Sequence, residues 1–69
     1  MADQTEPMRL VVVGAAGRMG KSLIRAVSEM PGVVLHAAIE REGSPFLGQD
    51  SGVVAGLMPN GIPVTADAL

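Results

Sequence analysis

The stretch that decides the fold is Leu-Val-Val-Val-Gly-Ala-Ala-Gly-Arg-Met-Gly, residues 10–20. A valine-rich apolar run ends here in three glycines spaced three apart, Gly14, Gly17 and Gly20. A strand that stops at a glycine and leads into a helix brings backbone N–H groups, at the positive end of that helix, close to an approaching phosphate. The stretch therefore predicts a strand, a glycine turn and a helix that together bind a nucleotide pyrophosphate.

The segments on either side of the turn complete a βαβ pattern. Residues 9–13 and 33–39 are short apolar runs typical of buried strands, and residues 17–30 between them have the pattern of a helix. Glu40 ends the second run, at the position from which a carboxylate reaches the adenosine ribose of a dinucleotide. We therefore predict an α/β fold: the first βαβ unit of a Rossmann-type dinucleotide-binding domain, with a parallel sheet.

The predicted helix is amphipathic. Its apolar residues recur at spacings of three and four, which aligns them along one side of a helix. We expect this side to pack against the sheet, and the charged residues, including Lys21 and Arg25, to lie on the other side. The apolar stripe consists of Met19, Leu23, Ala26, Val27 and Met30.

The second half of the chain is rich in glycine and proline. Five glycines and two prolines interrupt residues 41–61, where we expect loops with at most a helical turn within residues 50–57. Asp50 has no partner that the sequence identifies. Residues 62–65 predict a third strand, and residues 67–69 resemble a helix that is just being capped.

These elements suggest how the chain is divided. Residues 1–8 are expected to be a disordered N-terminal tail, and residues 9–69 the N-terminal portion of a dinucleotide-binding domain. Because a protein rarely ends where a helix begins, we expect the chain to be the N-terminal part of a longer protein.

Composition narrows the classes of partner. The 69 residues carry a net charge of −2 and no cysteine, and their five basic side chains are scattered. Neither nucleic acid nor a membrane surface is an expected partner, and thiolates cannot supply a zinc site. No apolar run approaches the roughly 20 residues of a membrane span. The sequence therefore favours a soluble cytoplasmic protein.

The glycine turn supplies most of the candidate binding residues. Gly14 allows the sharp reversal, Gly17 allows a phosphate to lie against the backbone, and Gly20 allows close packing of the helix on the strands. The spacing differs from G-x-G-x-x-G, because Ala16 and Met19 stand where its second and third glycines fall. The predicted pyrophosphate contacts are Gly14, Ala15, Ala16, Gly17, Arg18 and Met19.

A second motif overlaps the turn. Gly20-Lys21-Ser22 resembles the end of the phosphate-binding loop of ATP and GTP hydrolases, G-x-x-x-x-G-K-[ST]. That motif requires a glycine where this chain has Ala15, and Gly14 lies one residue too early. We favour the dinucleotide hypothesis and keep a nucleotide-hydrolysing module as an alternative.

Two neighbouring residues bear on the choice of cofactor. Glu40 can accept hydrogen bonds from the ribose hydroxyls of NAD, whereas its charge repels the 2′-phosphate of NADP. The guanidinium of Arg41 has the opposite preference. The cofactor is therefore predicted to be NADPH or NADH, with dual use compatible with this pair.

The chain resembles the 4-hydroxy-tetrahydrodipicolinate reductase (dihydrodipicolinate reductase) family. The resemblance rests on Val-Gly-Ala-Ala-Gly-Arg-Met-Gly at 13–20, Ala-Ile-Glu-Arg-Glu-Gly-Ser at 38–44 and Leu-Gly-Gln-Asp-Ser-Gly at 47–52. It covers nearly all of the chain from Arg9 onward. An amino-acid dehydrogenase of the aspartate or homoserine type, with a similar turn, is the nearer alternative.

The resemblance implies a full-length enzyme of the diaminopimelate route to lysine, which reduces a cyclic dicarboxylate by hydride transfer from NAD(P)H. It also implies a C-terminal substrate and tetramerisation domain, and hence a homotetramer when full length. By position, the turn would contact the pyrophosphate, Glu40 the ribose and Arg41 the 2′-phosphate. The family's catalytic histidine and lysine do not match any residue here, His36 included. We assign no catalytic residue and no metal ligand, and expect the 69 residues alone to be inactive.

Overall fold

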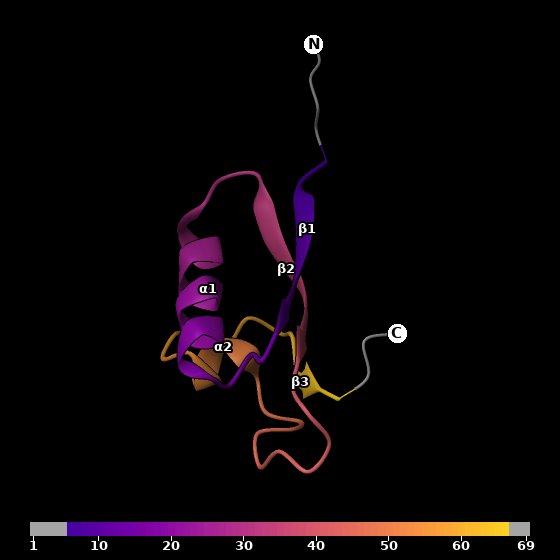
Figure 1. Ribbon diagram of the computed structural model, residues 1–69. Helices are drawn as coiled ribbons and strands as arrows, with labels where there is room; N and C mark the ends of the chain where they lie inside the picture. Colours follow the sequence, from indigo (N-terminus) through magenta and orange to yellow (C-terminus); the bar gives the residue numbers. More distant parts are fainter. Residues whose placement is uncertain (1–5, 67–69) are drawn as a thin grey trace.

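Three parallel strands and two helices make up the described part of the chain. The computed structural model describes residues 6–66. Strands β1 (Met8–Val13), β2 (Val33–Ile39) and β3 (Val64–Thr65) lie in the spatial order β1-β2-β3. Helix α1 (Arg18–Glu29) joins β1 to β2 and covers one face of the sheet, and the short α2 (Ser51–Val54) lies near the start of α1 (Figure 1). The predicted α/β fold with a parallel βαβ unit is confirmed.

The boundaries of the elements follow the sequence closely. β1 begins at Met8, one residue before the predicted strand and inside the predicted tail. β3 contains only the second half of the predicted 62–65 segment, because Pro63 forms an isolated antiparallel bridge with Asp50 instead. The remainder of the predicted tail at 1–5 and the predicted helix start at 67–69 lie outside the described residues.

The core lies between the sheet and α1. Each strand contributes one buried apolar side chain to the core cluster, from Val12, Ala38 and Val64, and Ile24 of α1 belongs to the same cluster. Ala55, directly after α2, closes the same cluster. Because these side chains are small or branched and none is aromatic, the helix can approach the sheet closely.

The ladder between β1 and β2 contains one irregularity. Leu10 pairs with Leu35 and Val11 pairs with Ala37, so His36 has no partner in β1. Side chains alternate between the faces of a strand, and an extra residue reverses that alternation. For this reason Leu35 and Ala38, three residues apart, both contribute to the core.

The apolar side of α1 differs from the predicted stripe. Gly20, Ile24 and Val27 are buried, whereas Met19 is 75% exposed. Of the predicted stripe, only Val27 is buried, and Leu23 and Met30 are about half exposed. The helix is turned by one residue relative to the prediction because Gly20 lets that side approach the turn. A hydropathy pattern alone does not indicate that a glycine lies on the buried side of a helix.

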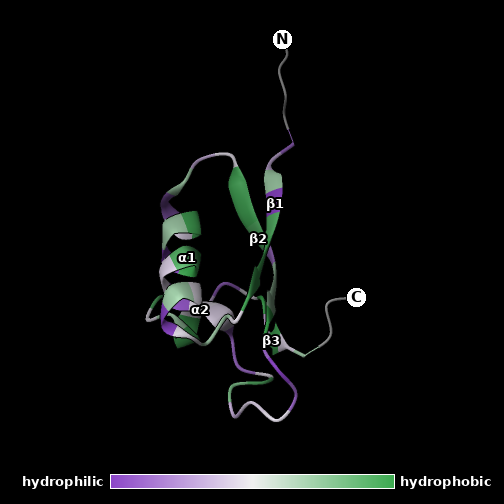
Figure 2. Cartoon of the chain, viewed as in Figure 1, coloured by the Kyte–Doolittle hydropathy of each residue, from purple (hydrophilic) through white to green (hydrophobic). Residues whose placement is uncertain are grey.

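The face of the sheet opposite α1 is apolar and open. Val11 and Val13 of β1 and Val34 of β2 are exposed. Figure 2 shows both long strands as predominantly hydrophobic. Ile39, the partner of Val13 in β2, is buried, so the open part of this face lies along β1 and the start of β2.

Asp50 organises the loop that leads to β3. Its carboxylate accepts hydrogen bonds from four backbone N–H groups, those of Gly52, Val53, Asn60 and Gly61, at 2.8–3.1 Å. The first two cap α2 and the other two fix the return of the chain. The predicted helical turn within residues 50–57 is confirmed, and the partners of Asp50 are backbone groups that no residue pattern reveals.

Two further observations concern the chain as a whole. Between residues 6 and 66, neither helix has the length and apolar character needed to cross a membrane. In the same part of the chain, no three His, Cys, Asp or Glu side chains gather in a way that could hold a metal ion.

Candidate dinucleotide site

The glycine turn is fixed by its own backbone. Gly14 adopts a φ of 74°, a left-handed conformation that favours glycine. The N–H groups of Gly14 and Ala15 both donate to the carbonyl of Ile39, at 2.8 and 3.0 Å, and that of Gly17 donates to the carbonyl of Gly14 at 2.9 Å. The turn is thereby attached to the carboxyl end of β2, where the predicted ribose acceptor lies.

Glu40 joins this turn through its side chain. Its Oε2 accepts a hydrogen bond from the N–H of Ala16 at 2.9 Å, across 24 residues of sequence. The backbone N–H of Glu40 donates to the carbonyl of Thr65, which places the residue between β1 and β3. The structure thus brings together the two parts of the site that the sequence predicts separately, the glycine turn and the acid at the end of β2.

The amides that are free to bind an anion lie slightly later than the sequence predicts. All four N–H groups from Gly14 to Gly17 donate within the protein. The first helical hydrogen bond of α1 runs from Lys21 to Gly17, and no side chain caps the helix. The N–H groups of Arg18, Met19 and Gly20 therefore have no hydrogen-bond partner in the described part of the chain. These three donors stand at the positive end of α1.

Gly20 determines how close α1 lies to the turn. A Cβ at this position would overlap the carbonyl oxygen of Gly14 and lie 2.8 Å from the Cα of Ala15. These are backbone atoms that cannot move aside without shifting the turn. The predicted packing role of Gly20 is confirmed. At Gly17 a Cβ would lie 3.3 Å from the carbonyl oxygen of Gly14, a tighter contact than most side chains make.

Two arginines lie at the edges of the site. Arg18, at the first position of α1, and Arg41, directly after Glu40, are both exposed. The carbonyl of Arg41 accepts a hydrogen bond from the N–H of Ser44 at 3.2 Å, which begins a series of turns leading away from β2. Neither guanidinium makes a hydrogen bond or an ion pair with another residue in the range 6–66, so both are available to a ligand.

The residues of the alternative phosphate-loop motif have other roles. Gly20, Lys21 and Ser22 are the third to fifth residues of α1 rather than part of a loop before it. The ammonium of Lys21 lies 5.9 Å from the centre of the Phe46 ring, within the range of a cation–π contact. Lys21 therefore joins α1 to the loop after β2, a contact that the sequence does not indicate.

Another helix contact was also missing from the sequence prediction. Arg25, expected to face water, donates from Nη1 to the carbonyl of Ala55 at 3.0 Å and so links α1 to the end of α2. His36, at the irregular position of β2, is exposed and lies in the middle of the strand rather than at the turn.

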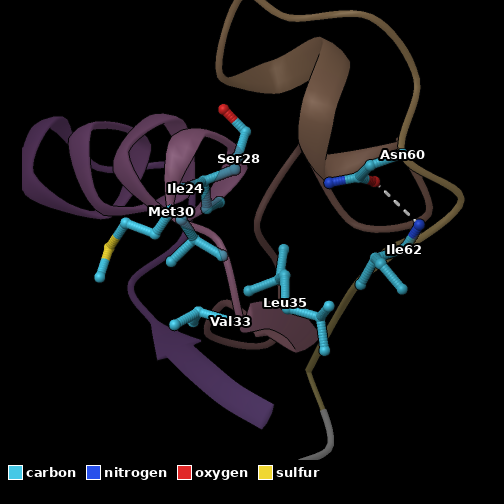
Figure 3. Close-up of a pocket in the computed structure, with 9 residues that line it drawn as sticks. Ile24, Ser28, Met30, Val33, Leu35, Asn60 and Ile62 are labelled. Carbon is cyan, nitrogen blue, oxygen red and sulfur yellow. Dashed lines mark hydrogen bonds between the residues drawn. The ribbon is translucent and has the colours of Figure 1, made fainter. Parts of the chain in front are cut away.

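An apolar groove of about 330 Å³ is lined by the second half of α1, the start of β2 and the segment before β3, and by no residue of the glycine turn. Figure 3 shows Ile24 and Ser28 from α1 and Met30 directly after it on one side of the groove, and Asn60 and Ile62 on the other. The side chain of Asn60 accepts a hydrogen bond from the backbone N–H of Ile62 at 2.9 Å. This hydrogen bond fixes the wall of the groove that Asn60 and Ile62 form. The groove is therefore separate from the candidate dinucleotide site.

A parallel βαβ unit with a glycine turn and an acid held against that turn defines a dinucleotide-binding unit of the Rossmann class. Comparison with protein families makes this more specific. Residues 8–69 match the family described as "Dihydrodipicolinate reductase, N-terminus". The chain belongs to this family.

Individual relatives agree with the family match. A 4-hydroxy-tetrahydrodipicolinate reductase of Agrobacterium fabrum is 63% identical over 62 residues, which are 90% of this chain and 22% of that relative. Its namesake in Sinorhizobium medicae is 69% identical over 58 residues, 84% of this chain and 21% of that relative. A third, from Afipia carboxidovorans, is 62% identical over 60 residues, 87% of this chain and 22% of that relative. The chain thus spans about a fifth of the length of these relatives.

Proposed function

We propose that this chain supplies the adenosine and pyrophosphate part of the cofactor site in a 4-hydroxy-tetrahydrodipicolinate reductase. The observation that supports the proposal is the hydrogen bond between Glu40 and Ala16, because it holds a carboxylate, the proposed ribose acceptor, against the turn that leads into the free amides of α1. The family match and the relatives' names supply the substrate. The alternative of an aspartate or homoserine dehydrogenase has no such support.

The residues present fit a reduced nicotinamide dinucleotide. The N–H groups of Arg18, Met19 and Gly20 would donate to the pyrophosphate, and Gly20 keeps the backbone close enough for α1 to do so. The outward oxygen of Glu40 would accept from the ribose, and Arg41 would lie beside a 2′-phosphate. We propose NADPH or NADH as the cofactor, with both accepted.

The bound cofactor supplies a hydride to the cyclic dicarboxylate substrate, while the protein supplies binding and orientation. The residues of this chain hold the end of the dinucleotide remote from the reacting carbon. Such remote contacts place the nicotinamide and contribute binding energy that the reacting end alone does not provide. We further propose a cytoplasmic homotetramer with a small-molecule substrate and no nucleic-acid or membrane partner.

Calorimetric titration of NADH, NADPH and Mg·ATP into the longest form of the protein available tests this proposal. We expect micromolar binding of at least one reduced nicotinamide cofactor, and weak ATP binding that does not depend on Mg²⁺. Tight, Mg²⁺-dependent binding of ATP without any binding of NADH or NADPH would refute the reductase hypothesis. It would also restore the phosphate-loop alternative, which the position of Lys21 within α1 disfavours.

A further inference from the structure

One side chain closes the glycine turn. Among the four amides from residue 14 to residue 17, three donate to backbone carbonyls and only that of Ala16 donates to a side chain, that of Glu40. The half-buried Glu40 reaches this amide from the end of β2. Loss of the Glu40 carboxylate therefore leaves one turn amide without its partner while the other three keep theirs.

We propose that Glu40 is a positioning residue of the glycine turn, in addition to being the ribose acceptor. By holding Ala16 to β2, it fixes the path of the chain into α1, and with it the three free amides of the first helical turn. Preorganisation of this kind lowers the cost of ordering a loop when a ligand binds. The part of the proposal that concerns ribose rests on the proposed function, whereas the part that concerns the turn does not.

The hydrogen bond from Ala16 also determines which oxygen of Glu40 is left to contact the ribose. With Oε2 committed to Ala16, Oε1 has no hydrogen-bond partner within residues 6–66 and is the oxygen left to accept from a ligand. A glutamine at position 40 can give its oxygen to Ala16 and direct its NH₂ group outward. Glu40→Gln therefore exchanges an outward acceptor for an outward donor and removes the negative charge without releasing the turn. An NH₂ donor suits a 2′-phosphate, whereas the ribose hydroxyls of NADH lose a charged acceptor and gain only a weaker, neutral hydrogen bond.

Amide hydrogen exchange of the ligand-free chain, followed by NMR, tests the turn directly. We expect Glu40→Ala to accelerate exchange of the Ala16 amide by about tenfold relative to the Val64 amide, and Glu40→Gln to restore it. The Val64 amide, which donates to Gln49 at 2.8 Å, reports whether the fold as a whole has loosened. Glu42→Ala is the matched control, because Glu42 is an exposed carboxylate two residues away.

Binding of the two cofactors to the same variants supplies the second readout. We expect Glu40→Gln to raise the ratio of NADPH to NADH affinity by about tenfold, and Glu40→Ala to weaken both cofactors. If Glu40 acted only through its charge, Glu40→Gln and Glu40→Ala would show the same ratio of NADPH to NADH affinity. That result would overturn the proposal. Equal Ala16 exchange in Glu40→Ala and the unmodified chain, or a Gln variant that exchanges as fast as the Ala variant, would also overturn it. Failure of the chain to bind either cofactor, with the exchange pattern as expected, refutes the proposed function and leaves the turn role standing.

Discussion

Glu40 and Arg41 are adjacent residues to which we assign, as a proposal, opposite preferences at the adenosine ribose. Arg41 is exposed and its guanidinium makes no hydrogen bond or ion pair with another described residue, so its removal should not disturb the fold. Because a guanidinium–phosphate contact is charge-assisted, Arg41→Ala is expected to lower NADPH affinity about 10- to 100-fold while nearly sparing NADH. Calorimetric titration of both cofactors measures this. Arg9→Ala, at an exposed position of β1, is the control, and equal losses for the two cofactors would remove Arg41 from the phosphate role.

The carboxylate of Asp50 makes the free energy of unfolding depend on pH. Desolvation raises the pKa of Asp50, but hydrogen bonds from the amides of Asn60, Gly61, Val53 and Gly52 outweigh it, and the pKa lies below its ordinary value. The unfolded chain then binds a proton at a higher pH than the folded chain does. The stabilisation from Asp50 is therefore present above the unfolded value of about 3.9 and is lost as the pH falls through the lower, folded value.

Thermal unfolding of Asp50→Asn across a pH series tests this linkage. The variant is expected to melt below the unmodified chain near neutral pH, because an amide cannot accept the four N–H groups as a carboxylate does. The difference in Tm should shrink once the pH falls below about 4. Glu42→Gln, a neutralised carboxylate without these contacts, should show no such convergence. A Tm difference that stays constant down to about pH 3 would contradict the assignment.

At the scale of elements, the contact between α1 and the turn reverses the usual effect of replacing a helical glycine by alanine. Alanine in place of an interior helical glycine normally stabilises by about 1 kcal/mol. At position 20 the added Cβ would strike the backbone of Gly14 and Ala15. Gly20→Ala is therefore expected to destabilise the fold by about 1–3 kcal/mol, the usual range for overpacking.

Chemical denaturation of the glycine variants measures the size of this contact. Gly17→Ala, whose Cβ would lie 3.3 Å from the Gly14 carbonyl oxygen, should be milder than Gly20→Ala. Ser22→Ala, at an exposed position of the same helix, should be nearly neutral. A Gly20→Ala variant as stable as the unmodified chain would show that α1 does not need to lie this close to the turn.

The elements themselves could be predicted from sequence because their signals are local. A valine run, a glycine turn and Pro31-Gly32 after the helix mark their own positions, and β2 has the predicted bounds. The rotation of α1 could not be predicted, because it depends on the close packing of Gly20 against the backbone of the turn. A hydropathy pattern does not indicate such a contact. The hydrogen bond between Glu40 and Ala16 was not predicted, because 24 residues separate them and the sequence assigns them to different parts of the cofactor. The four partners of Asp50 are amides, which every sequence offers and no pattern distinguishes.

At the scale of the whole molecule, the open face of the sheet should govern how the chain behaves in solution. Val11 and Val13 are 48% and 75% exposed on one side of β1, and Val34 of β2, the partner of Arg9, is exposed on the same face. Contiguous apolar surface of this kind promotes association. The double variant Val11→Thr, Val13→Thr is expected to reduce self-association of the chain in sedimentation velocity while leaving its circular dichroism unchanged.

Val12 provides the matched control for this prediction. It lies between the two exposed valines but points into the core, where it is 4% exposed. A hydroxyl buried there without a partner should destabilise the fold, so Val12→Thr is expected to lower Tm without improving solubility. Self-association that is unchanged in the double variant would exclude the open face as its cause.

The irregular pairing of β2 determines which insertions and deletions the chain can tolerate. β2 carries one residue more than β1 along the same length of ladder, and His36 is that residue. Deletion of His36 would leave Leu35 and Ala37 with the partners they already have, and Glu40 at the same place beside the turn. Loss of a residue from β1 has no such spare position and would move the glycine turn out of phase with Glu40. A single codon can therefore be lost from the middle of β2 more safely than from β1, although the two strands look equally regular in sequence.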